Sequence, residues 1–533
     1  MAAGFQQVSA MPTPIIAGQP KDILNLNQEL FDQSVVECGG HEEEPELKAV
    51  LSKVSRWLLP ICFLAGVFSY LESTNLNFAA LQLNAGLGFA PQDYGLGAGL
   101  FFLGYGLGHV PSTFATMRCG AGWYSSIVIA WGIVATCGAF ISSSAGLCLQ
   151  RFCMGLAEAG AIPSALHLMS QFYPVQMRSK PFLAVTLANV VSVVFAGPLA
   201  AGIMTLDGRA GLRGWQSLFI IEGLPSIALG SVMMLVLPSG PLTAWMLTPR
   251  ERQFLHNRVH EGNAEAAEAA KQRLQWKQMI SLTMEALRMP QLWFFSIAAF
   301  LWVLGIFSLN AWMPIIIKNM LAGTALQSSS SSGGSSATNT LHATLLATIP
   351  YFCAAIAMWL NTWSASLLRE RTLHVGLPCV FGGILLALFQ PMYSASSAGG
   401  FSVLVIAIAC AYSGQSNMFA RVTESLDTRH AGVGIAIFNA IGAAAGGFSG
   451  PWVVGTLVNR IGSFVPSMVF MGVFLTCGGI MLSGFGIWEL QQRRKLQRQQ
   501  QQQCEGKLPK EQEEREGADS CVVVKDEDFA EEC

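Results

Sequence analysis

Long apolar runs alternate with short polar segments along most of the chain. A helix that crosses the ~30 Å hydrocarbon layer of a bilayer needs about 20 largely apolar residues. Runs of this kind, broken by charge clusters and by Gly, Pro and Ser, recur twelve times. They predict transmembrane helices near residues 57–79, 92–117, 122–143, 146–170, 181–206, 215–238, 291–317, 342–364, 373–393, 400–424, 430–458 and 465–488. The pattern therefore predicts an all-α, multi-pass integral membrane protein.

One long polar interruption, residues 239–290, divides the twelve runs into six and six. It predicts two six-helix bundles, 57–238 and 291–488, joined by a linker. An internal repeat supports this division, because residues 195–202 (FAGPLAAG) and 448–455 (FSGPWVVG) share the pattern Phe-x-Gly-Pro-x-x-x-Gly. Both segments fall in the fifth run of their half. We interpret the matching positions as the mark of a duplication, which is common in transporters.

The distribution of Lys and Arg predicts the orientation in the membrane, since cytoplasmic loops carry the excess of basic residues. With both termini in the cytoplasm, the loops on that side hold thirteen basic residues and the opposite loops hold four. Residues 1–56 and 489–533 are then cytoplasmic tails, and 239–290 is a cytoplasmic linker. The Gln-rich, charged C-terminal tail is expected to be disordered, and the Ser-rich segment within 321–341 to be a flexible outer loop.

Composition agrees with a membrane protein and excludes several other classes. Hydrophobic residues make up 52% of the chain and charged residues only 12%, about half the share usual in soluble domains. A net charge of −2 gives no basis for nucleic-acid binding. The thirteen cysteines form no CxxC pair, and neither a Walker loop nor an HExxH motif occurs. We therefore expect no enzyme activity, cofactor, metal site or disulfide framework.

Charged side chains inside the apolar runs are the first candidates for function. Each costs about 2.5–3.5 kcal/mol at the bilayer centre and is expected to face the bundle interior or water. Six occur: Glu72, Arg151, Glu158, Glu222, Arg421 and Glu424. The last two lie near a cytoplasmic helix end, where a structural role through snorkelling is favoured. For Glu222, a helix-packing hydrogen bond and a role in coupling are equally plausible.

Arg151 and Glu158 are seven residues apart, which places them on one face of a helix and about 10.5 Å apart along it. Each then needs a partner from another helix or from a ligand. Glu72 is the carboxylate nearest in depth to Arg151. Our functional hypothesis is a Glu72–Arg151 pair that a solute or a proton breaks, and the structural alternative is a permanent interhelical ion pair or simple snorkelling.

Uncharged polar residues in the runs extend the candidate site. His109, near mid-depth, is a candidate proton relay, although a histidine that donates to a neighbouring carbonyl is the simpler interpretation. Interhelical amide hydrogen bonds are common in membranes, so each amide is a weaker candidate. The amides expected to line a solute cavity are Asn75, Asn77, Asn189, Asn310, Gln415, Asn417 and Asn439. The glycines of residues 95–108 are expected to allow close helix approach.

These segments resemble the major facilitator superfamily and, within it, the anion:cation symporter branch, which includes allantoate, nicotinate, tartrate and sugar-acid permeases. The segments that carry the resemblance are LESTNLNFA (71–79), YGLGAGLFFLGYGLGHVPS (94–112), RFCMGLAEAGAIPS (151–164), GWQSLFIIEGLPS (214–226), LTPRERQFL (247–255), FSLNAWMPIIIK (307–318) and GIAIFNAIGAAAGGFSGPWVVG (434–455). They run through both halves. The resemblance implies the major facilitator fold, with two bundles that work by alternating access.

The resemblance also implies proton-driven uptake of a small organic anion. Glu72 and Glu158 then correspond to proton-titrating carboxylates, and Arg151 to the residue that meets the solute carboxylate. The chain departs from the branch at Ser73, where an arginine is usual, and at His109, where an acidic residue is common. We therefore expect a proton-coupled symporter of a carboxylate in the plasma membrane. The alternatives are a facilitative carrier of a neutral solute and a non-transporting membrane sensor built on the same fold.

Overall fold

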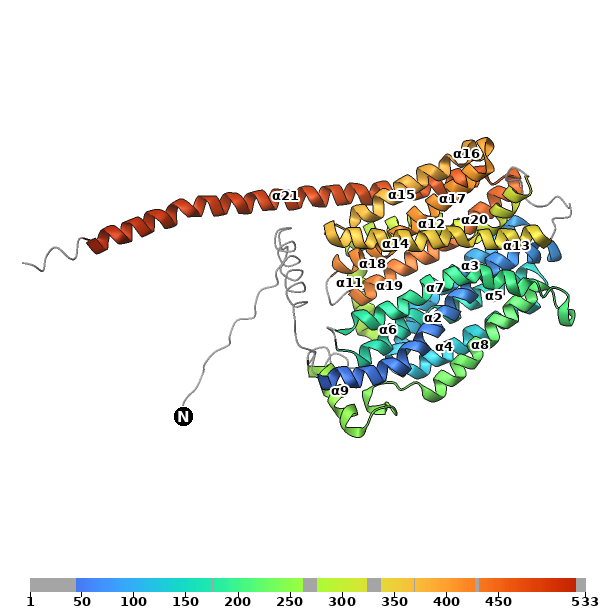
Figure 1. Ribbon diagram of the computed structural model, residues 1–533, viewed down its shortest axis with the longest axis horizontal. Coiled ribbons are helices and arrows are strands. Elements are labelled where there is room, and N and C mark those ends of the chain that lie inside the picture. Colours follow the sequence, from blue (N-terminus) through green and yellow to red (C-terminus); the bar gives the residue numbers. More distant parts are fainter. Residues whose placement is uncertain are drawn as a thin grey trace, which may run out of the picture. The chain divides into compact units, whose positions relative to one another are not determined.

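The computed structural model describes residues 45–174, 177–261, 276–323, 337–368, 370–426 and 431–523. The chain divides into two compact units, Met1–Lys53 and Val54–Cys533. Of the first unit, only the start of helix α2 lies within the described residues. The second unit contains all the remaining helices, and no β-strand occurs in the described ranges (Figure 1).

Seven α-helices form the N-terminal half of the structure. They are α2 (Pro45–Leu87), α3 (Pro91–Cys119), α4 (Ala121–Cys137), α5 (Ser144–Glu158), α6 (Ala161–Phe172), α7 (Ser179–Met204) and α8 (Gly214–Val236). Short 3-10 turns cover Gly138–Phe140 and Arg209–Gly211. The helices α5 and α6 together occupy the fourth expected span.

Ten α-helices and a π-helical segment form the C-terminal half. They are α12 (Pro290–Leu321), α13 (Ala337–Leu346), α14 (Thr348–Leu368), α15 (Thr372–Ala387), α16 (Phe389–Ala395), α17 (Ser397–Ser413), α18 (Gln415–Glu424), α19 (Ala431–Asn439), the π segment Ala440–Gly446, α20 (Gly447–Ile461) and α21 (Val465–Val523). A helix or helix pair therefore lies at each of the twelve expected positions.

Length and composition qualify nine of the described helices as membrane spans, or ten if the bent pair α15–α16 is one span. The two helices of that pair meet at 53°. Helices α3 and α7 lie at two further expected positions, and the segment Val194–Met204 of α7 is a shorter apolar helix. The count of twelve spans stays a prediction.

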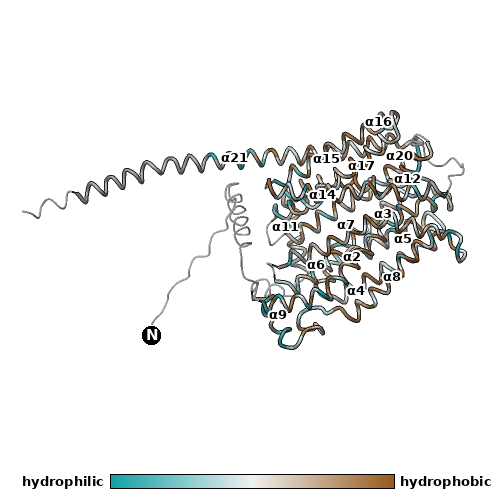
Figure 2. Tube along the Cα trace, in the orientation of Figure 1, coloured by the Kyte–Doolittle hydropathy of each residue, from teal (hydrophilic) through white to brown (hydrophobic). Residues whose placement is uncertain are grey.

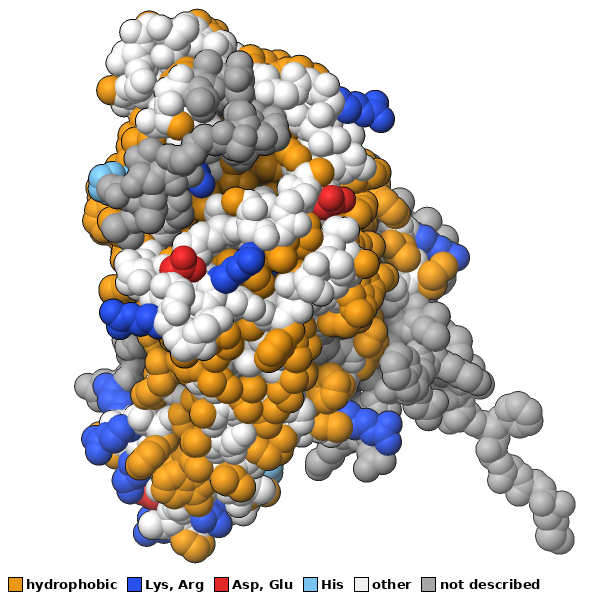
Figure 3. All heavy atoms as spheres, turned by 90° about the vertical axis from the view of Figure 1, so that its right-hand side faces the viewer, with side chains coloured by type: hydrophobic (Ala, Val, Ile, Leu, Met, Phe, Trp, Pro, Cys, Tyr) orange, Lys and Arg blue, Asp and Glu red, His pale blue; other side chains and the backbone are white. Residues whose placement is uncertain are grey.

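The outer surface of the helices is apolar, as a lipid-facing surface requires. Hydrophobic residues follow the helices along most of their length (Figure 2). Large apolar side chains such as Phe140 (78% exposed), Trp359 (69%) and Leu235 (86%) point outward. Figure 3 looks at the right-hand end of Figure 1, where helices end and connecting segments lie, and there charged side chains form small groups among apolar ones. The chain is thus an integral multi-pass membrane protein by composition, helix length and surface.

The segments outside the bundles differ in part from expectation. In the linker, the structure has a 3-10 turn at Pro241–Thr243 and the helices α9 (Pro249–Glu261) and α11 (Trp276–Leu287), and residues 262–275 lie outside the described ranges. Most of the Ser-rich loop, 324–336, also lies outside them. Where a disordered tail was expected from residue 489, α21 continues to Val523. Gln, Glu, Lys and Arg have high intrinsic helix propensity, which accounts for this continuation.

Glycines allow the two halves to approach closely along α3, as their spacing predicted. A Cβ atom at Gly99 would lie 2.5 Å from the backbone oxygen of Phe448 in α20, and one at Gly95 would overlap the backbone oxygen of Pro451. The Tyr94 hydroxyl donates to the backbone oxygen of Ala311 in α12 at 2.6 Å. The halves are therefore packed together along the first part of α3.

The contacts between halves follow the internal repeat. Helix α20 packs on α3, and α7 packs on α14. The repeat segments 195–202 and 448–455 lie in α7 and α20, the fifth spans of the two halves, and their partners α14 and α3 occupy the second positions. Equivalent helices thus make equivalent contacts, as a duplicated architecture predicts.

Close packing inside the N-terminal half yields a stability prediction. A Cβ atom at Gly155 in α5 would overlap the backbone oxygen of Phe101 and lie 2.7 Å from the Tyr105 nitrogen of α3. We expect Gly155→Ala to lower the stability of the purified protein by about 1–3 kcal/mol, the usual cost of overpacking. Thermal unfolding measures this effect. Gly202→Ala in α7, with no heavy atom within 4 Å, should leave the melting temperature unchanged or raise it, and an equal effect of both substitutions would contradict the packing argument.

Candidate transport site

Arg151 is a buried cation that forms no ion pair with any carboxylate of the described residues. It lies in α5 and is 3% exposed. Its Nη2 donates to the backbone oxygen of Ser73 in α2 at 2.9 Å, and its guanidinium carbon lies 4.8 Å from the centre of the Phe101 ring. Within the described ranges, its Nε and Nη1 atoms have no hydrogen-bond partner. Two donors of the guanidinium thus stay available for another group.

Glu158 lies at the C-terminal end of α5, on the same helix face as Arg151. It is 6% exposed. The hydroxyl of Ser69 in α2 donates to its Oε1 at 2.5 Å, while its Oε2 has no hydrogen-bond partner among the described side chains and backbone. One oxygen of this buried carboxyl group is therefore held by α2 and the other is left for a proton or a second donor.

Glu72 does not contact Arg151, so the expected pair is not formed in this structure. Instead the Ser226 hydroxyl of α8 donates to the Glu72 carboxylate. Successive residues of an α-helix point about 100° apart. Glu72 therefore faces α8, while the neighbouring backbone oxygen of Ser73 faces α5 and holds Arg151. Glu222, which also lies in α8, is within electrostatic range of Glu72.

His109 is buried in α3, where it was expected. Its ring lies 5.4 Å from the ring of Tyr105, between ring centres, and within hydrogen-bonding range of the backbone of Ala159. Its Nδ1 has no partner in the described part of the chain. The backbone contact fits the simpler interpretation of this histidine.

The seven candidate amides lie in different surroundings. Asn310 of α12 donates to the Tyr412 hydroxyl and accepts a hydrogen bond from Tyr351 at 3.0 Å. Asn75 lies beside Glu222. Gln415 and Asn439 are half-buried at the ends of α18 and α19, and the side chain of Asn189 lies outside the described residues. Asn417 donates to Asn361 at 3.3 Å. Asn77 and Asn310 both line the cavity described next.

A small cavity lies between the two halves. The centre of a water molecule fits within a volume of about 20 Å³ in this cavity, which leaves room for about one or two water molecules. Residues of α2, α7, α12 and α14 line it: Tyr70, Thr74, Asn77, Phe78, Ala196, Asn310, Pro314 and Tyr351. No charged side chain is among them. Its position between the halves is where the substrate site of a two-bundle transporter is expected.

Tyrosines are the part of this site that the sequence analysis missed. Tyr70 and Tyr351 line the cavity. The rings of Tyr351 and Tyr412 lie 6.1 Å apart, and both hydroxyls contact Asn310. Together they bring α2 of one half and α12, α14 and α17 of the other to one place. The feature of the sequence that could have identified them is the hydroxyl group of each tyrosine, which is overlooked when tyrosine is counted as an apolar aromatic residue.

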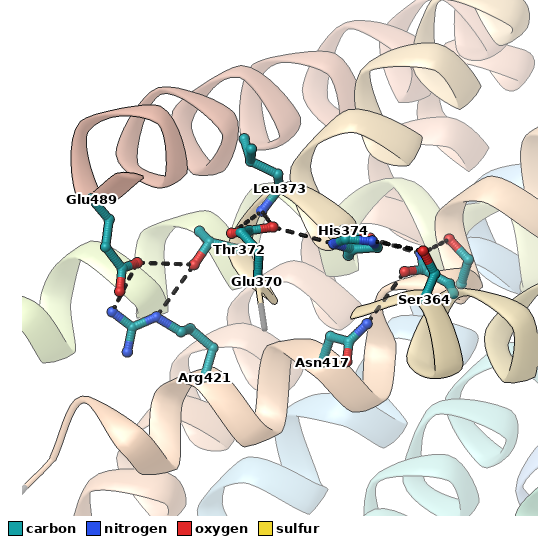
Figure 4. Close-up of polar contacts among 10 residues, drawn as sticks. Ser364, Glu370, Thr372, Leu373, His374, Asn417, Arg421 and Glu489 are labelled. Atoms are coloured by element: carbon teal, nitrogen blue, oxygen red, sulfur yellow. Dashed lines mark hydrogen bonds and ion pairs between the residues drawn. The ribbon is translucent and has the colours of Figure 1, made fainter. Parts of the chain in front are cut away.

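A second polar cluster holds four helices of the C-terminal half together (Figure 4). Arg421 of α18 lies 3.3 Å from the Glu489 carboxylate of α21, and its Nε donates to the Thr372 hydroxyl at 3.3 Å. Arg371 and Glu424 form a further ion pair at 3.2 Å. Arg421 and Glu424 are thus held in ion pairs, which fits the structural role that was favoured for them from the sequence.

Glu370 and His374 complete this cluster. The Glu370 carboxylate accepts from the backbone nitrogen of Leu373 at 2.8 and 2.9 Å and thereby caps the first turn of α15. It also lies 3.2 Å from His374 Nδ1, while His374 Nε2 lies 3.1 Å from the Ser364 hydroxyl. These contacts lie within one half and do not reach the cavity.

Several solved structures share the fold of this chain. A bacterial homolog of the human lysosomal transporter Spinster, in an inward-facing and unoccupied conformation, aligns with a TM-score of 0.63 at 16% identity, over 83% of this chain and 97% of that one. A D-xylose-proton symporter aligns with a TM-score of 0.56 at 13% identity, over 80% and 96%. At these identities the likeness shows the fold alone, which is that of a membrane transporter.

Sequence comparison places the chain in a family. The model of the Major Facilitator Superfamily matches residues 62–451, and the chain belongs to this family. A putative tartrate transporter of Agrobacterium vitis is 31% identical over 81% of this chain and 90% of its own length. A quinolone resistance transporter of Acinetobacter baumannii is 29% identical over 81% and 94%, and the putative metabolite transport protein NicT of Pseudomonas putida is 31% identical over 64% and 72%.

These relatives are all transporters, and none is an enzyme. They confirm the resemblance to the organic-anion permease branch that the sequence motifs predicted. The chain is therefore a membrane transporter of this superfamily that moves a small-molecule solute.

Proposed function

We propose that this protein is a proton-coupled symporter of a small organic anion, a carboxylate, that works by alternating access. The proposal includes twelve transmembrane spans in two six-helix bundles. It places the protein in the plasma membrane with both termini in the cytoplasm. The observation that carries the proposal is the state of Arg151. It is a buried guanidinium with free donors and without an ion-pair partner among the described residues.

An uncompensated buried charge is costly, so a resident cation in this position needs an anion. A carboxylate of the solute supplies one, with hydrogen bonds that are shorter and stronger than those between neutral groups. The neighbouring turn of α2 connects this point to the cavity, because Ser73 holds Arg151 while Tyr70 and Thr74 line the cavity. The solute carboxylate then lies at Arg151 and its remainder lies among the tyrosines. The relatives named as tartrate and metabolite transporters support this substrate class.

Glu158 is the proposed proton-coupling group, and Glu72 is the second candidate. Glu158 shares a helix face with Arg151 and acts on it electrostatically. When Glu158 is ionised, it offsets part of the guanidinium charge; when it is protonated, Arg151 attracts the solute anion more strongly. Proton binding and anion binding then favour each other, which is the thermodynamic requirement for symport. His109, one turn from Tyr105 in α3, is a further proposed relay.

Alternating access requires that the contact between α3 and α20 opens and closes. In the structure this contact is closed and the cavity admits only about one or two waters. We expect Gly99→Leu to hold the halves apart and to lower the transport rate about tenfold or more, given the cost of overpacking. Uptake into proteoliposomes measures the rate. The matched control is Gly202→Leu, which meets open space in α7; a wild-type rate in Gly99→Leu would contradict the closing role of this contact.

A facilitative carrier of a neutral solute is the second candidate. Two observations favour it: Ser73 stands where the branch that the chain resembles usually has an arginine, and the side chains that line the cavity are all uncharged. Tyrosine and asparagine can bind hydroxyl or amide groups without a charge.

Ligand stabilisation of the purified protein tests the substrate class. Carboxylates, ureides and vitamins are screened at several pH values for their effect on the melting temperature, because a ligand that binds the folded state stabilises it. We expect at least one carboxylate to raise the melting temperature, more strongly at acidic than at alkaline pH. Stabilisation by neutral solutes alone would favour the facilitative carrier. No stabilisation by any solute would favour a non-transporting sensor.

A further inference from the structure

Four oxygen-bearing side chains meet between α2 and α8, away from Arg151. Two come from α2, Glu72 and Asn75, and two from α8, Glu222 and Ser226. Residues three or four positions apart share one face of a helix, so each pair presents its side chains together. Glu72, Asn75 and Glu222 are 1%, 2% and 4% exposed, and Ser226 is fully buried.

Contacts link the two pairs across the helices. The Ser226 hydroxyl donates to the Glu72 carboxylate, Asn75 lies beside Glu222, and the two carboxylates are within electrostatic range of each other. Four atoms in the cluster nevertheless have no hydrogen-bond partner in the described ranges: Glu72 Oε2, Glu222 Oε2, and the Oδ1 and Nδ2 atoms of Asn75. A buried amide oxygen and two carboxylate oxygens without a donor, gathered in one cluster, point to a missing ligand.

The charges around the cluster favour a cation as the ligand. The groups that act electrostatically on Glu72 are Glu222 and Glu158, both acidic. Arg151 is bound instead to the backbone oxygen of Ser73. Two carboxylates inside a membrane protein without a basic partner from the described residues lack the compensation that buried charges require.

The chemistry of the donors narrows the choice further. The candidate ligands are carboxylate, amide and hydroxyl oxygens, which hard cations prefer, and neither a thiolate nor an imidazole is among them. Pro225 lies between Glu222 and Ser226 in α8. Because proline has no N–H group, the backbone oxygen of Ile221 lacks its usual helical donor, which makes it one more candidate oxygen ligand in this stretch of the helix. Ca²⁺ takes six to eight oxygens and Mg²⁺ retains several waters. A closely packed site with few side-chain oxygens fits a monovalent ion better.

We propose that Glu72, Asn75, Glu222 and Ser226 form a binding site for Na⁺ between α2 and α8. The site lies within the N-terminal half and includes neither Arg151 nor Glu158. It goes beyond proton-coupled transport, because it adds a second cation that binds on a different face of α2. Since Glu72 is shared with the proposed proton chemistry, Na⁺ and a proton compete there, whereas Glu158 keeps its own proton.

Thermal unfolding of the purified full-length protein in NaCl, LiCl, KCl and choline chloride at equal ionic strength tests the site. We expect Na⁺ to raise the melting temperature of the wild type by about 3 °C or more at saturation relative to choline, with a smaller effect of K⁺. Glu222→Gln, Asn75→Ala and Ser226→Ala should each reduce the shift by half or more. The matched control is Ser231→Ala in α8, whose exposed hydroxyl bonds only to its own helix, and it should keep the full shift.

If Glu222→Gln fails to fold, Ser226→Ala still tests the site, because it removes a single oxygen. Direct binding of radioactive sodium to the variants gives a second measurement that does not depend on thermal unfolding. An equal melting temperature in Na⁺ and choline would overturn the proposal, as would a sodium shift that survives all three substitutions. A melting temperature that depends on pH and not on Na⁺ would also overturn it and would assign the cluster to a proton. Glu158→Gln separates the two accounts: it should keep the sodium shift, so the loss of proton coupling and the loss of Na⁺ binding are distinguishable.

Discussion

Replacing Glu158 by glutamine is expected to abolish the accumulation of solute that a pH gradient drives into proteoliposomes. Glutamine keeps the size and the hydrogen bond from Ser69 but cannot take up or release a proton. Without a titratable group beside Arg151, the pH gradient no longer drives solute binding. Exchange of internal for external solute should persist, because exchange requires only that the loaded carrier changes conformation.

The control for this experiment is Glu424→Gln. Like Glu158, Glu424 is a carboxylate within an expected span, in this case the tenth. It differs in that it pairs with Arg371 at 3.2 Å and is 43% exposed. It should keep gradient-driven accumulation. Normal accumulation in Glu158→Gln would refute the assignment of coupling to this residue, and loss of both accumulation and exchange would indicate damage to the fold.

Replacing Arg151 by glutamine is expected to lower the transport of the carboxylate by about 30-fold or more. Removing one partner of a buried, hydrogen-bonded charge pair costs about 2–5 kcal/mol, and a factor of ten corresponds to about 1.4 kcal/mol. Arg151→Lys should recover part of the activity, because it keeps the charge but loses the planar fork of donors. Initial rates of uptake over a range of solute concentrations measure both effects.

The matched control is Arg118→Gln, which changes an exposed arginine at the end of α3. It should leave the uptake rate unchanged. A carboxylate transported equally well by Arg151→Gln would contradict the role of the guanidinium, and an unchanged rate for a neutral solute would support the facilitative alternative.

The positions of the helices were largely predictable from the chain, because the bilayer fixes the length of an apolar helix. The repeat of residues 195–202 and 448–455 also predicted which helices are equivalent, and the contacts of α7 and α20 agree. Helix α21 was predictable only to the end of its apolar part. Its continuation depends on helix propensity, which hydropathy does not measure.

The sequence suggests candidate residues for a site, but it does not predict their contacts. Arg151 and Glu158 followed from their seven-residue spacing, and both are buried on one face of α5. The direction of Glu72 toward Ser226 depends on the rotation of α2 about its axis, which packing against neighbouring helices sets. Tyr70, Tyr351 and Tyr412 were missed for a related reason, because only the assembled helices show that their hydroxyls meet.

Simultaneous measurement of solute uptake and proton movement in proteoliposomes tests the central claim most directly, namely that buried ionisable groups of α5 couple a proton to an organic anion. The account predicts that a carboxylate found in the stabilisation screen accumulates above its external concentration only when the outside is more acidic. It also predicts that the uptake of this carboxylate makes a weakly buffered external medium more alkaline. Accumulation without any proton movement, or uptake that only equalises the two concentrations whatever the pH gradient, would contradict it.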